Sequence, residues 1–374
     1  MKYIDDFRNP EVAAQFVRKI AAQGQALAAQ GRRVHIMEVC GSHTMAIGRY
    51  GIRPLLPESV ELISGPGCPV CVTDPGYIDA ALALAGREAI IATFGDMIRV
   101  PGSDSDLAAC RSQGGDVRVC YSPGAAIDLA KGHPDREVVF LAVGFETTIA
   151  PVVCLVEEAL RLGVKNLSLL TAFKLVPPAL RALLTDPAIR IDAFLCPAHV
   201  SAIIGARAYE PIADEFRVPC VISGFEPLDI LYGVNGILAQ VLNRQAKVEN
   251  RYARVVRPDG NPKAKARIER YLEPVDAVWR GIGVIPASGL ALRSEFSGFD
   301  AAKKFAVPVR PGRQQAGCRC GDVIKGKLRP TACALFAKAC TPDHPVGPCM
   351  VSSEGTCAAY FKYGMPDEKR GDKQ

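Results

Sequence analysis

The chain has 374 residues, enough for two or three domains of ordinary size. Hydrophobic residues make up 49% and charged residues 22%, as in folded globular proteins. The formal net charge is +6, and the basic residues are spread out without interleaved aromatic residues, which argues against nucleic-acid binding. Asp5 and Asp6 stand where a signal peptide would need apolar residues, and no apolar run reaches the ~18 residues of a membrane span. We therefore expect a soluble, cytoplasmic protein with no nucleic-acid or membrane partner.

The first element expected along the chain is a helix over residues 9–30. We expect the N-terminal segment that contains it, residues 1–31, to pack against the third domain described below. From about residue 32 to 246, apolar runs rich in Val and Ile alternate with helix-like segments, a pattern typical of βαβ units and a parallel sheet. We expect strands at residues 33–39, 60–64, 89–94, 117–121, 138–143, 167–172, 191–195 and 218–222. The breaker cluster Lys131-Gly132-His133-Pro134 predicts a boundary between two α/β domains, residues 32–131 and 132–246.

Beyond Ala246 the alternating pattern ends. Residues 247–317 contain one expected helix, at 262–272, together with the single tryptophan, Trp279, and a glycine-rich stretch. We expect this segment to be a linker that leads into a third, irregular domain over residues 247–374. The last residues, 366–374, are nearly all charged or turn-forming and predict a tail with nothing to bury.

Most of the expected strands end in a turn that carries glycine, cysteine, histidine or an acidic residue. In open α/β sheets, ligands bind at the carboxyl ends of the strands, so these turns are expected to converge on one cleft. An alternative for any one of them is that glycine and proline merely form the loop. The turns are Cys40-Gly41-Ser42-His43, Gly65-Pro66-Gly67-Cys68, Gly95-Asp96, Gly144-Phe145-Glu146, Cys196-Pro197-Ala198-His199 and Gly224-Phe225-Glu226.

Fourteen cysteines in a cytosolic chain indicate metal ligation or redox chemistry more than structural disulfides. Cys68-Pro69-Val70-Cys71 is a C-x-x-C pair whose sulfurs can close a disulfide, and the absence of a second pair at matching spacing favours redox use over zinc. Cys40 follows an expected strand, and helix N–H groups and His43 nearby predict a lowered thiol pKa. A nucleophile or soft-metal ligand would suit that setting. The alternative for Cys40 is a small core residue.

Six further cysteines lie between residues 318 and 357. Cys318, Cys333, Cys340 and Cys357 can supply four thiolates to a 4Fe-4S cluster or to a tetrahedral zinc, and the spacing alone does not decide between the two metals. Cys320 and Cys349 are alternates for these four positions. The other five cysteines are interpreted as packing residues because they lie in or beside apolar segments: Cys110, Cys120, Cys154, Cys196 and Cys220.

Seven segments, in order over nearly the whole chain, resemble the motifs of the HypD family of NiFe-hydrogenase maturation factors. They are MEVCGSHTMAI (37–47), SGPGCPVCVT (64–73), TFGDMIRVPGS (93–103), VGFETTIAP (143–151), CPAHVSAIIG (196–205), GFEPLDIL (224–231) and CTPDHPVGPCMVSSEGTCAAY (340–360). The resemblance implies two Rossmann-like parallel-sheet domains facing across a cleft and a smaller, mostly helical domain that holds a 4Fe-4S cluster.

The resemblance also implies a role for each group of cysteines. Members of the family work with a small HypC-type chaperone, assemble iron bearing cyanide and carbon monoxide, and accept cyanide from a HypE-type protein. Cys40 matches the thiol that binds this iron, and Cys68 with Cys71 matches the redox pair. The terminal group matches the cluster ligands, and its two leftover cysteines could form a second disulfide, as in ferredoxin:thioredoxin reductase.

Two functions of different classes therefore follow. One is an assembly scaffold that holds iron on Cys40 and supplies electrons through the cluster and the dithiol pair. The other is an enzyme, a cluster-dependent thiol–disulfide reductase. The Cys-Gly-Ser-His turn favours the scaffold, because a simple disulfide reductase has no need of Cys40.

Overall fold

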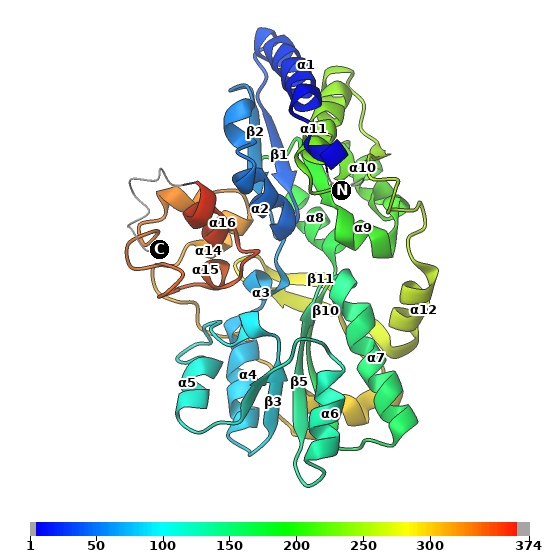
Figure 1. The fold of residues 1–374 in the computed structure, drawn as a ribbon, viewed down its shortest axis with the longest axis vertical. Helices are drawn as coiled ribbons and strands as arrows, with labels where there is room; N and C mark the ends of the chain where they lie inside the picture. The colour runs from blue at the N-terminus through cyan, green and yellow to red at the C-terminus, as the bar shows by residue number, and fades with distance from the viewer. Residues whose placement is uncertain (1–4, 365–374) are drawn as a thin grey trace.

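The computed structural model describes residues 5–364, as two sheets with surrounding helices and a smaller third part beside them (Figure 1). The predicted fold class, α/β with two Rossmann-like sheets, is confirmed, and all eight expected strands are present within a few residues of their expected bounds. Along residues 5–364 no helix is both long and apolar enough to cross a membrane. The predicted charged tail, residues 366–374, lies outside the described residues.

The first sheet is entirely parallel, with strand order β2-β1-β7-β8-β9. Counted along the chain this is the order 2-1-3-4-5 of doubly wound sheets, in which the order reverses between the first and third strands and ligands bind at their carboxyl ends. The reversal here lies between β1 and β7. The strands are β1 (Val34–Glu38), β2 (Val60–Ser64), β7 (Ala193–Pro197), β8 (Cys220–Ser223) and β9 (Val248–Asn250), and the helices are α1 (Pro10–Ala29), α2 (Gly41–Arg49), α9 (Ala198–Ile204), α10 (Glu210–Phe216) and α11 (Pro227–Leu242).

The second sheet has six strands in the order β10-β11-β6-β5-β3-β4. Its four parallel strands again reverse order, here between β3 and β5, and an antiparallel hairpin extends the sheet beside β6. The strands are β3 (Ile90–Thr93), β4 (Val117–Val119), β5 (Val138–Gly144), β6 (Leu167–Lys174), β10 (Leu272–Trp279) and β11 (Gly283–Leu292), and the helices are α4 (Pro75–Ala85), α5 (Leu107–Ser112), α6 (Ala125–Gly132), α7 (Glu146–Leu162), α8 (Val176–Thr185), α12 (Pro262–Tyr271) and α13 (Ala301–Lys304).

The predicted division at residue 131 is wrong, because the chain crosses between the two sheets three times. β1 and β2 pair with β7, β8 and β9, whereas β3 to β6 pair with β10 and β11. Periodicity identifies strands but carries no information about which strands pair, and the breaker cluster predicted to be a domain boundary is the end of α6. The predicted linker is also wrong at residues 272–292, because these residues form the antiparallel hairpin of the second sheet.

The N-terminal helix also packs elsewhere than expected. α1 lies against α11 at the outer face of the first sheet and not against the third part (Figure 1). Ile20 and Leu27 are fully buried there, and the Gln23 and Asn235 side chains are hydrogen-bonded to each other at 3.0 Å. The apolar face of α1 therefore completes the core of the first domain. Asn9 caps the helix by accepting from the backbone N–H groups of Glu11 and Val12.

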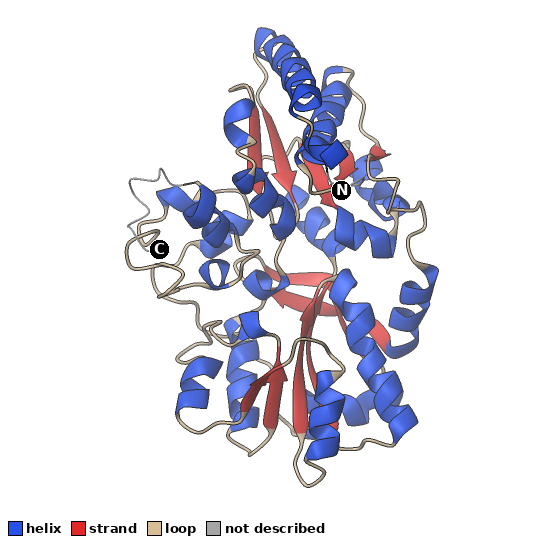
Figure 2. Ribbon diagram, in the orientation of Figure 1, coloured by secondary structure: helices blue, strands red, loops and turns tan. Residues whose placement is uncertain are grey.

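The third part is irregular, with a few short helices joined by longer loops, as Figure 2 shows. It packs against α2, α3 (Pro69–Val72) and the segment after α4, so a single core runs from it into both sheets. Its helices are α14 (Cys320–Ile324), α15 (Pro348–Val351) and α16 (Thr356–Tyr363). The 3-10 helices of the chain are η1 (Asp5–Arg8), η2 (Arg53–Leu55), η3 (Gly95–Met97), η4 (Ala206–Tyr209), η5 (Ser294–Phe299) and η6 (Pro330–Ala332).

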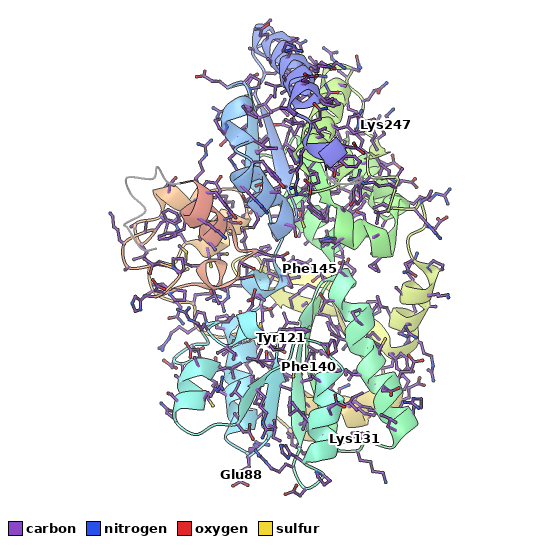
Figure 3. All side chains as sticks on the ribbon, viewed as in Figure 1. Glu88, Tyr121, Lys131, Phe140, Phe145 and Lys247 are labelled. Carbon is purple, nitrogen blue, oxygen red and sulfur yellow. The ribbon has the colours of Figure 1, made fainter. Side chains whose placement is uncertain are left out.

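The carboxyl ends of both sheets point toward the middle of the molecule. In Figure 3, Lys247, which precedes β9, lies near one end, and Glu88, which precedes β3, lies at the other. Phe145, which directly follows β5, lies between them. Both strand-order reversals therefore face the region where the two sheets and the third part meet.

Candidate functional site

Cys40 occupies the ligand-binding position that the first sheet predicts. It follows β1 at the reversal point and is the residue before α2, so the backbone N–H groups of Ser42 and His43 point at its sulfur. The side chain is 8% exposed. Burial, followed by the nearby Glu354 carboxylate, raises the pKa of the Cys40 thiol to about 11. The expected lowered pKa is thus wrong, because desolvation outweighs the helix N–H groups. A metal ion at this thiol would have to displace its proton.

His43 does not serve as a proton partner for Cys40 in this structure. Its ring nitrogen Nε2 donates to the carbonyl oxygens of Gly224, at 2.9 Å, and Ser223, at 3.2 Å, while its buried Nδ1 has no hydrogen-bond partner in the described part of the chain. Burial lowers the pKa of His43 to about 4, so the ring is neutral at physiological pH. The His43 side chain therefore connects the start of α2 to the loop after β8 through hydrogen bonds.

Three residues that the sequence did not single out as site residues lie at or near the Cys40 turn. The Ser42 hydroxyl donates to the Glu354 carboxylate at 2.8 Å, which brings a loop of the third part to the Cys40 turn. The centre of the Phe225 ring lies 4.8 Å from the centre of the His43 ring and 4.4 Å from the centre of the His199 ring. All three stand in segments quoted above, and the expected convergence of the strand-end turns accounts for Phe225 and His199. No spacing rule places Glu354, more than 300 positions along the chain, beside the Cys40 turn.

Gly67 holds the C-x-x-C turn directly against Cys40. The Gly41 N–H donates to the Gly67 carbonyl at 3.0 Å, and a Cβ added at Gly67 would lie 2.4 Å from the Cys40 carbonyl carbon and from Gly41 N. Both of these atoms belong to the backbone and cannot rotate away. The close approach therefore requires glycine at this position and sets the spacing between Cys40 and the dithiol pair.

We expect Gly67→Ala to destabilise the protein by about 1 to 3 kcal/mol, because the new methyl group overpacks a backbone contact. Thermal and urea unfolding would measure the loss. Gly132→Ala is the matched control, since a Cβ there meets nothing within 4 Å. Equal stability of the Gly67→Ala and Gly132→Ala variants would contradict the close approach.

The C-x-x-C pair lies at the start of the short helix α3. Cys68 is the residue before the helix and its sulfur accepts the Cys71 N–H at 3.3 Å. The Cys71 thiol donates to the Pro348 carbonyl at 3.8 Å, and the Cys349 thiol lies beside it. Burial raises the pKa of Cys71 well above its ordinary value. The pair therefore lies between the Cys40 turn and α15 of the third part.

The six C-terminal cysteines gather around one apolar pocket of the third part. Burial first, and then the neighbouring thiols of Cys320, Cys318, Cys340 and Cys333, raise the pKa of Cys357. The Cys340 sulfur accepts the Val346 N–H at 3.4 Å. The pocket is lined by Cys318, Arg319, Cys320, Val323, Cys333, Leu335, Phe336, Cys340, Gly347, Cys349, Met350 and Cys357.

Two of the six also face the dithiol pair. The Cys349 thiol is a neighbour of the Cys320 thiol on one side and of the Cys71 thiol on the other, and the Cys320 thiol is a neighbour of the Cys318 thiol. A continuous row of thiols therefore runs from Cys68 through Cys71, Cys349 and Cys320 to Cys318. Within residues 5–364, no three His, Cys, Asp or Glu side chains form a group that could hold a single metal ion.

Comparison with known proteins decides the family. The family model HypD, described as "Hydrogenase formation hypA family", matches residues 12–364. The hydrogenase maturation factor HypD of Cupriavidus necator is 46% identical over 97% of both chains, and that of Escherichia coli K12 is 43% identical over 99% of this chain and 100% of its own. The hydrogenase expression/formation protein HupD of Azotobacter chroococcum is 46% identical over 97% of both. The chain belongs to the HypD family.

Membership of the HypD family places the chain in hydrogenase maturation, as the resemblance of the motifs implied. The interpretation of five cysteines as packing residues agrees with burial for three of them, Cys120, Cys196 and Cys220, whereas Cys110 and Cys154 are partly exposed. Cys196 and Cys220 lie on neighbouring strands of the first sheet with their thiols close to each other, and the Cys220 thiol donates to the Val218 carbonyl at 3.7 Å.

Glu146, in the VGFETTIAP motif shared with the HypD family, is a second buried polar group at a strand-order reversal. It follows β5, and its Oε1 accepts the Val176 N–H at 2.9 Å. Its Oε2 is buried without a hydrogen-bond partner in the described residues. Burial raises the pKa of Glu146 from 4.5 to about 7. The folded protein therefore holds this proton more tightly than the unfolded chain does.

We expect this proton to make stability pH-dependent. The contribution of protonated Glu146 is complete below pH 4.5 and is lost as the pH rises through about 7. Glu146→Gln keeps a neutral acceptor, so at pH 8 it should raise the free energy of unfolding by up to roughly 3 kcal/mol, with no gain near pH 4.5. Urea unfolding at both pH values measures this. Glu157→Gln, on the same helix and half exposed, is the control. An equal change in the free energy of unfolding for both variants would contradict the role of the Glu146 proton.

Proposed function

We propose that the chain holds the iron of a NiFe hydrogenase while this iron carries cyanide and carbon monoxide. In this proposal Cys40 binds the iron jointly with a HypC-type partner, a HypE-type partner delivers cyanide, and a 4Fe-4S cluster with the Cys68/Cys71 pair supplies electrons. The observation that carries it is the row of thiols from Cys68 to Cys318, which begins beside the Cys40 turn and ends at the cysteine pocket. Family membership supports the same assignment.

Cys40 suits an iron cargo because thiolate is a ligand for soft, low-spin iron. Its raised pKa means that the iron must replace the thiol proton, and the N–H groups of Ser42 and His43 then stabilise the resulting sulfur charge. The neutral ring of His43 is already committed to carbonyl oxygens, so it keeps α2 in place and takes no proton from Cys40. The proton must leave by another path.

A hollow beside Cys40 is the surface that we assign to a partner protein. It has a volume of about 330 Å³ and lies over α2, the loop after β8 and the loop after α15. Ser42 and Glu354 line it, and these are the residues that close over the Cys40 turn. A partner cysteine that reaches the same iron would have to approach at this hollow, which supports a HypC-type protein as the occupant.

The donor set of the cysteine pocket fits a 4Fe-4S cluster. Cys357 lies near Cys318, Cys333 and Cys340, and Cys340 lies near Cys318 and Cys333, whereas Cys320 and Cys349 also lie near Cys71. Gly347 leaves room for sulfur, since a Cβ there would lie 2.5 Å from Cys318 Sγ. The Val346 N–H at Cys340 is the kind of N–H to sulfur bond that stabilises cluster thiolates. A bound cluster would supply single electrons to this row.

The row divides naturally into two dithiol pairs, Cys68 with Cys71 and Cys320 with Cys349. Closing either disulfide releases two electrons and two protons, and opening it consumes them. Electrons from an external one-electron donor would pass the cluster ligands first, then the second pair, then the pair beside Cys40. We assign Cys320 and Cys349 to this relay. The cluster is then held by the other four cysteines of the pocket, Cys318, Cys333, Cys340 and Cys357.

We expect the Cys68/Cys71 pair to cycle between dithiol and disulfide, because a C-x-x-C loop closes with little rearrangement. Alkylation after an acid quench, read by mass spectrometry, should count two fewer thiols on the peptide with residues 68–71 after mild oxidation. The partly exposed Cys110 is the control and should stay fully alkylated. A pair that remains unchanged while hydrogenase maturation proceeds would rule out the redox role.

A cluster-dependent thiol–disulfide reductase is the second candidate, and the same row of thiols favours it. The two functions differ in what they need at Cys40. Steady turnover of a protein disulfide by the Cys40→Ser variant would support the reductase, whereas a scaffold needs the thiol at every cycle.

The test of the proposed function is anaerobic co-purification with a HypC-type partner followed by infrared spectroscopy. We expect absorption bands of metal-bound cyanide and carbon monoxide in the complex, lost when iron is removed. An iron-loaded complex without either band would refute the proposal.

A further inference from the structure

Arg280 is a buried cation that the proposed function has not used. It is 1% exposed and occupies the tip of the β10–β11 hairpin, which the sequence did not predict. Its Nε donates to the Thr73 carbonyl at 2.7 Å and its Nη2 to the Pro101 carbonyl at 3.1 Å. Among residues 5–364 no carboxylate lies within ion-pair distance of it. A buried charge without a counter-ion is costly, so its retention calls for a negative group nearby.

The hairpin tip is inserted between the two cysteine segments. On one side, the Arg280 N–H donates at 2.8 Å to the carbonyl of Val72, the residue after Cys71. On the other side, a Cβ added at Gly281 would lie 2.2 Å from the Cα of Gly321, the residue after Cys320. Gly281 also has a φ of +76°, so both its space and its backbone conformation require glycine. The backbone thus places Arg280 between the dithiol pair and the cysteine pocket.

Arg280 lies next to the cysteine pocket, because its chain neighbour Gly281 packs against Gly321, the residue after Cys320. A cluster held by four thiolates carries net negative charge, and adding one electron without a proton makes it more negative. A fixed cation in a buried setting stabilises the reduced form more than the oxidised form, because Coulomb energies are large where water is excluded.

We propose that Arg280 sets the reduction potential of the iron–sulfur centre, as the buried counter-charge for the electron that the centre accepts. This inference rests on the proposed cluster site and adds a residue outside the cysteine motifs. Arg280 touches no reacting atom, so it acts as an electrostatic tuning residue. The alternative is that Arg280 only pins the hairpin to α3 through its hydrogen bonds with backbone carbonyls.

Redox titration of the anaerobically purified full chain with dithionite, followed by electron paramagnetic resonance, separates the two roles. Arg280→Gln and Arg280→Met remove the charge, whereas Arg280→Lys keeps it and loses the guanidinium hydrogen bonds. We expect the neutral variants to lower the equilibrium constant for one-electron reduction at least tenfold, about 59 mV, and the lysine variant to stay close to the unmodified protein. A purely structural role would lower the thermal stability of all three and shift no potential.

Arg136→Gln is the matched control for loss of one positive charge. Arg136 donates to the Glu88 carbonyl, and Glu88 lies at the far end of the second sheet in Figure 3. Equal potentials in the control and the neutral Arg280 variants would overturn the inference. So would failure of both neutral variants to hold the cluster while Arg280→Lys holds it, since Arg280 would then maintain the site. Absence of acid-labile sulfide in the unmodified protein would instead refute the proposed cluster.

Discussion

Cys40→Ser should abolish hydrogenase maturation while leaving the protein folded. A hydroxyl is a hard donor that keeps its proton near neutral pH, so it binds low-spin iron poorly. The substitution removes little bulk and sits at a turn, so we expect a stability loss of only about 1 to 3 kcal/mol from the buried hydroxyl. The variant should keep its brown colour and its contact with a HypC-type partner, yet show no infrared bands of cyanide or carbon monoxide.

Cys120→Ser is the matched control for this experiment. Cys120 also follows a parallel strand, β4, and is 3% exposed, but it lies in the second sheet away from the row of thiols. Its serine variant should cost similar stability and mature hydrogenase normally. A Cys40→Ser variant that matures hydrogenase as the Cys120→Ser variant does would show that Cys40 is a core residue.

Much of the local structure could be predicted from the sequence because it depends on neighbouring residues. The eight strands of residues 33–222 are marked by short runs of apolar residues, and each expected strand is found. The turn at Cys40 was predicted for the same reason, since it directly follows such a run. The pairing of strands was not predictable, because β1 and β7 are neighbours across more than 150 residues, which include four strands of the other sheet.

The chemistry of the site depended on contacts that no spacing rule contains. The N–H groups near Cys40 suggested a lowered pKa, but the third part of the chain covers this thiol and brings Glu354 to it, so the pKa is raised. His43 was expected to face Cys40, yet the loop after β8 supplies two carbonyl oxygens that hold its ring. Arg280 escaped notice because the hairpin that carries it has no clear strand periodicity.

The strand-order reversals explain why the cysteines lie where they do. In the first sheet the reversal lies between β1 and β7 and places Cys40 at the ligand position. In the second sheet it lies between β3 and β5, and its turns carry Asp96 and Glu146. Asp96 accepts the Ser352 hydroxyl at 2.9 Å, so both reversal points contact the loop after α15. The third part is therefore fastened to both domains at their ligand-binding edges.

Cys340→Ala is expected to remove the proposed iron–sulfur centre and unfold the third part. A metal centre in a small irregular domain contributes much of its folding free energy, because the short helices α14, α15 and α16 bury little apolar surface by themselves. The anaerobically purified variant should lose its brown colour and acid-labile sulfide. Limited proteolysis should then cut within residues 313–364, whereas the two α/β domains resist.

Two controls separate loss of the centre from loss of a buried thiol. Cys154→Ala removes a thiol from α7, outside the row, and should keep iron and sulfide at the level of the unmodified protein. Cys349→Ala removes a member of the proposed relay, so it should keep the centre and lose electron transfer to Cys71. A colourless Cys349→Ala variant would move Cys349 into the ligand set. Stoichiometric zinc without acid-labile sulfide in the unmodified protein would show that the four thiolates hold zinc, and a Cys340→Ala variant that retains a full complement of iron and sulfide would exclude Cys340 as a ligand.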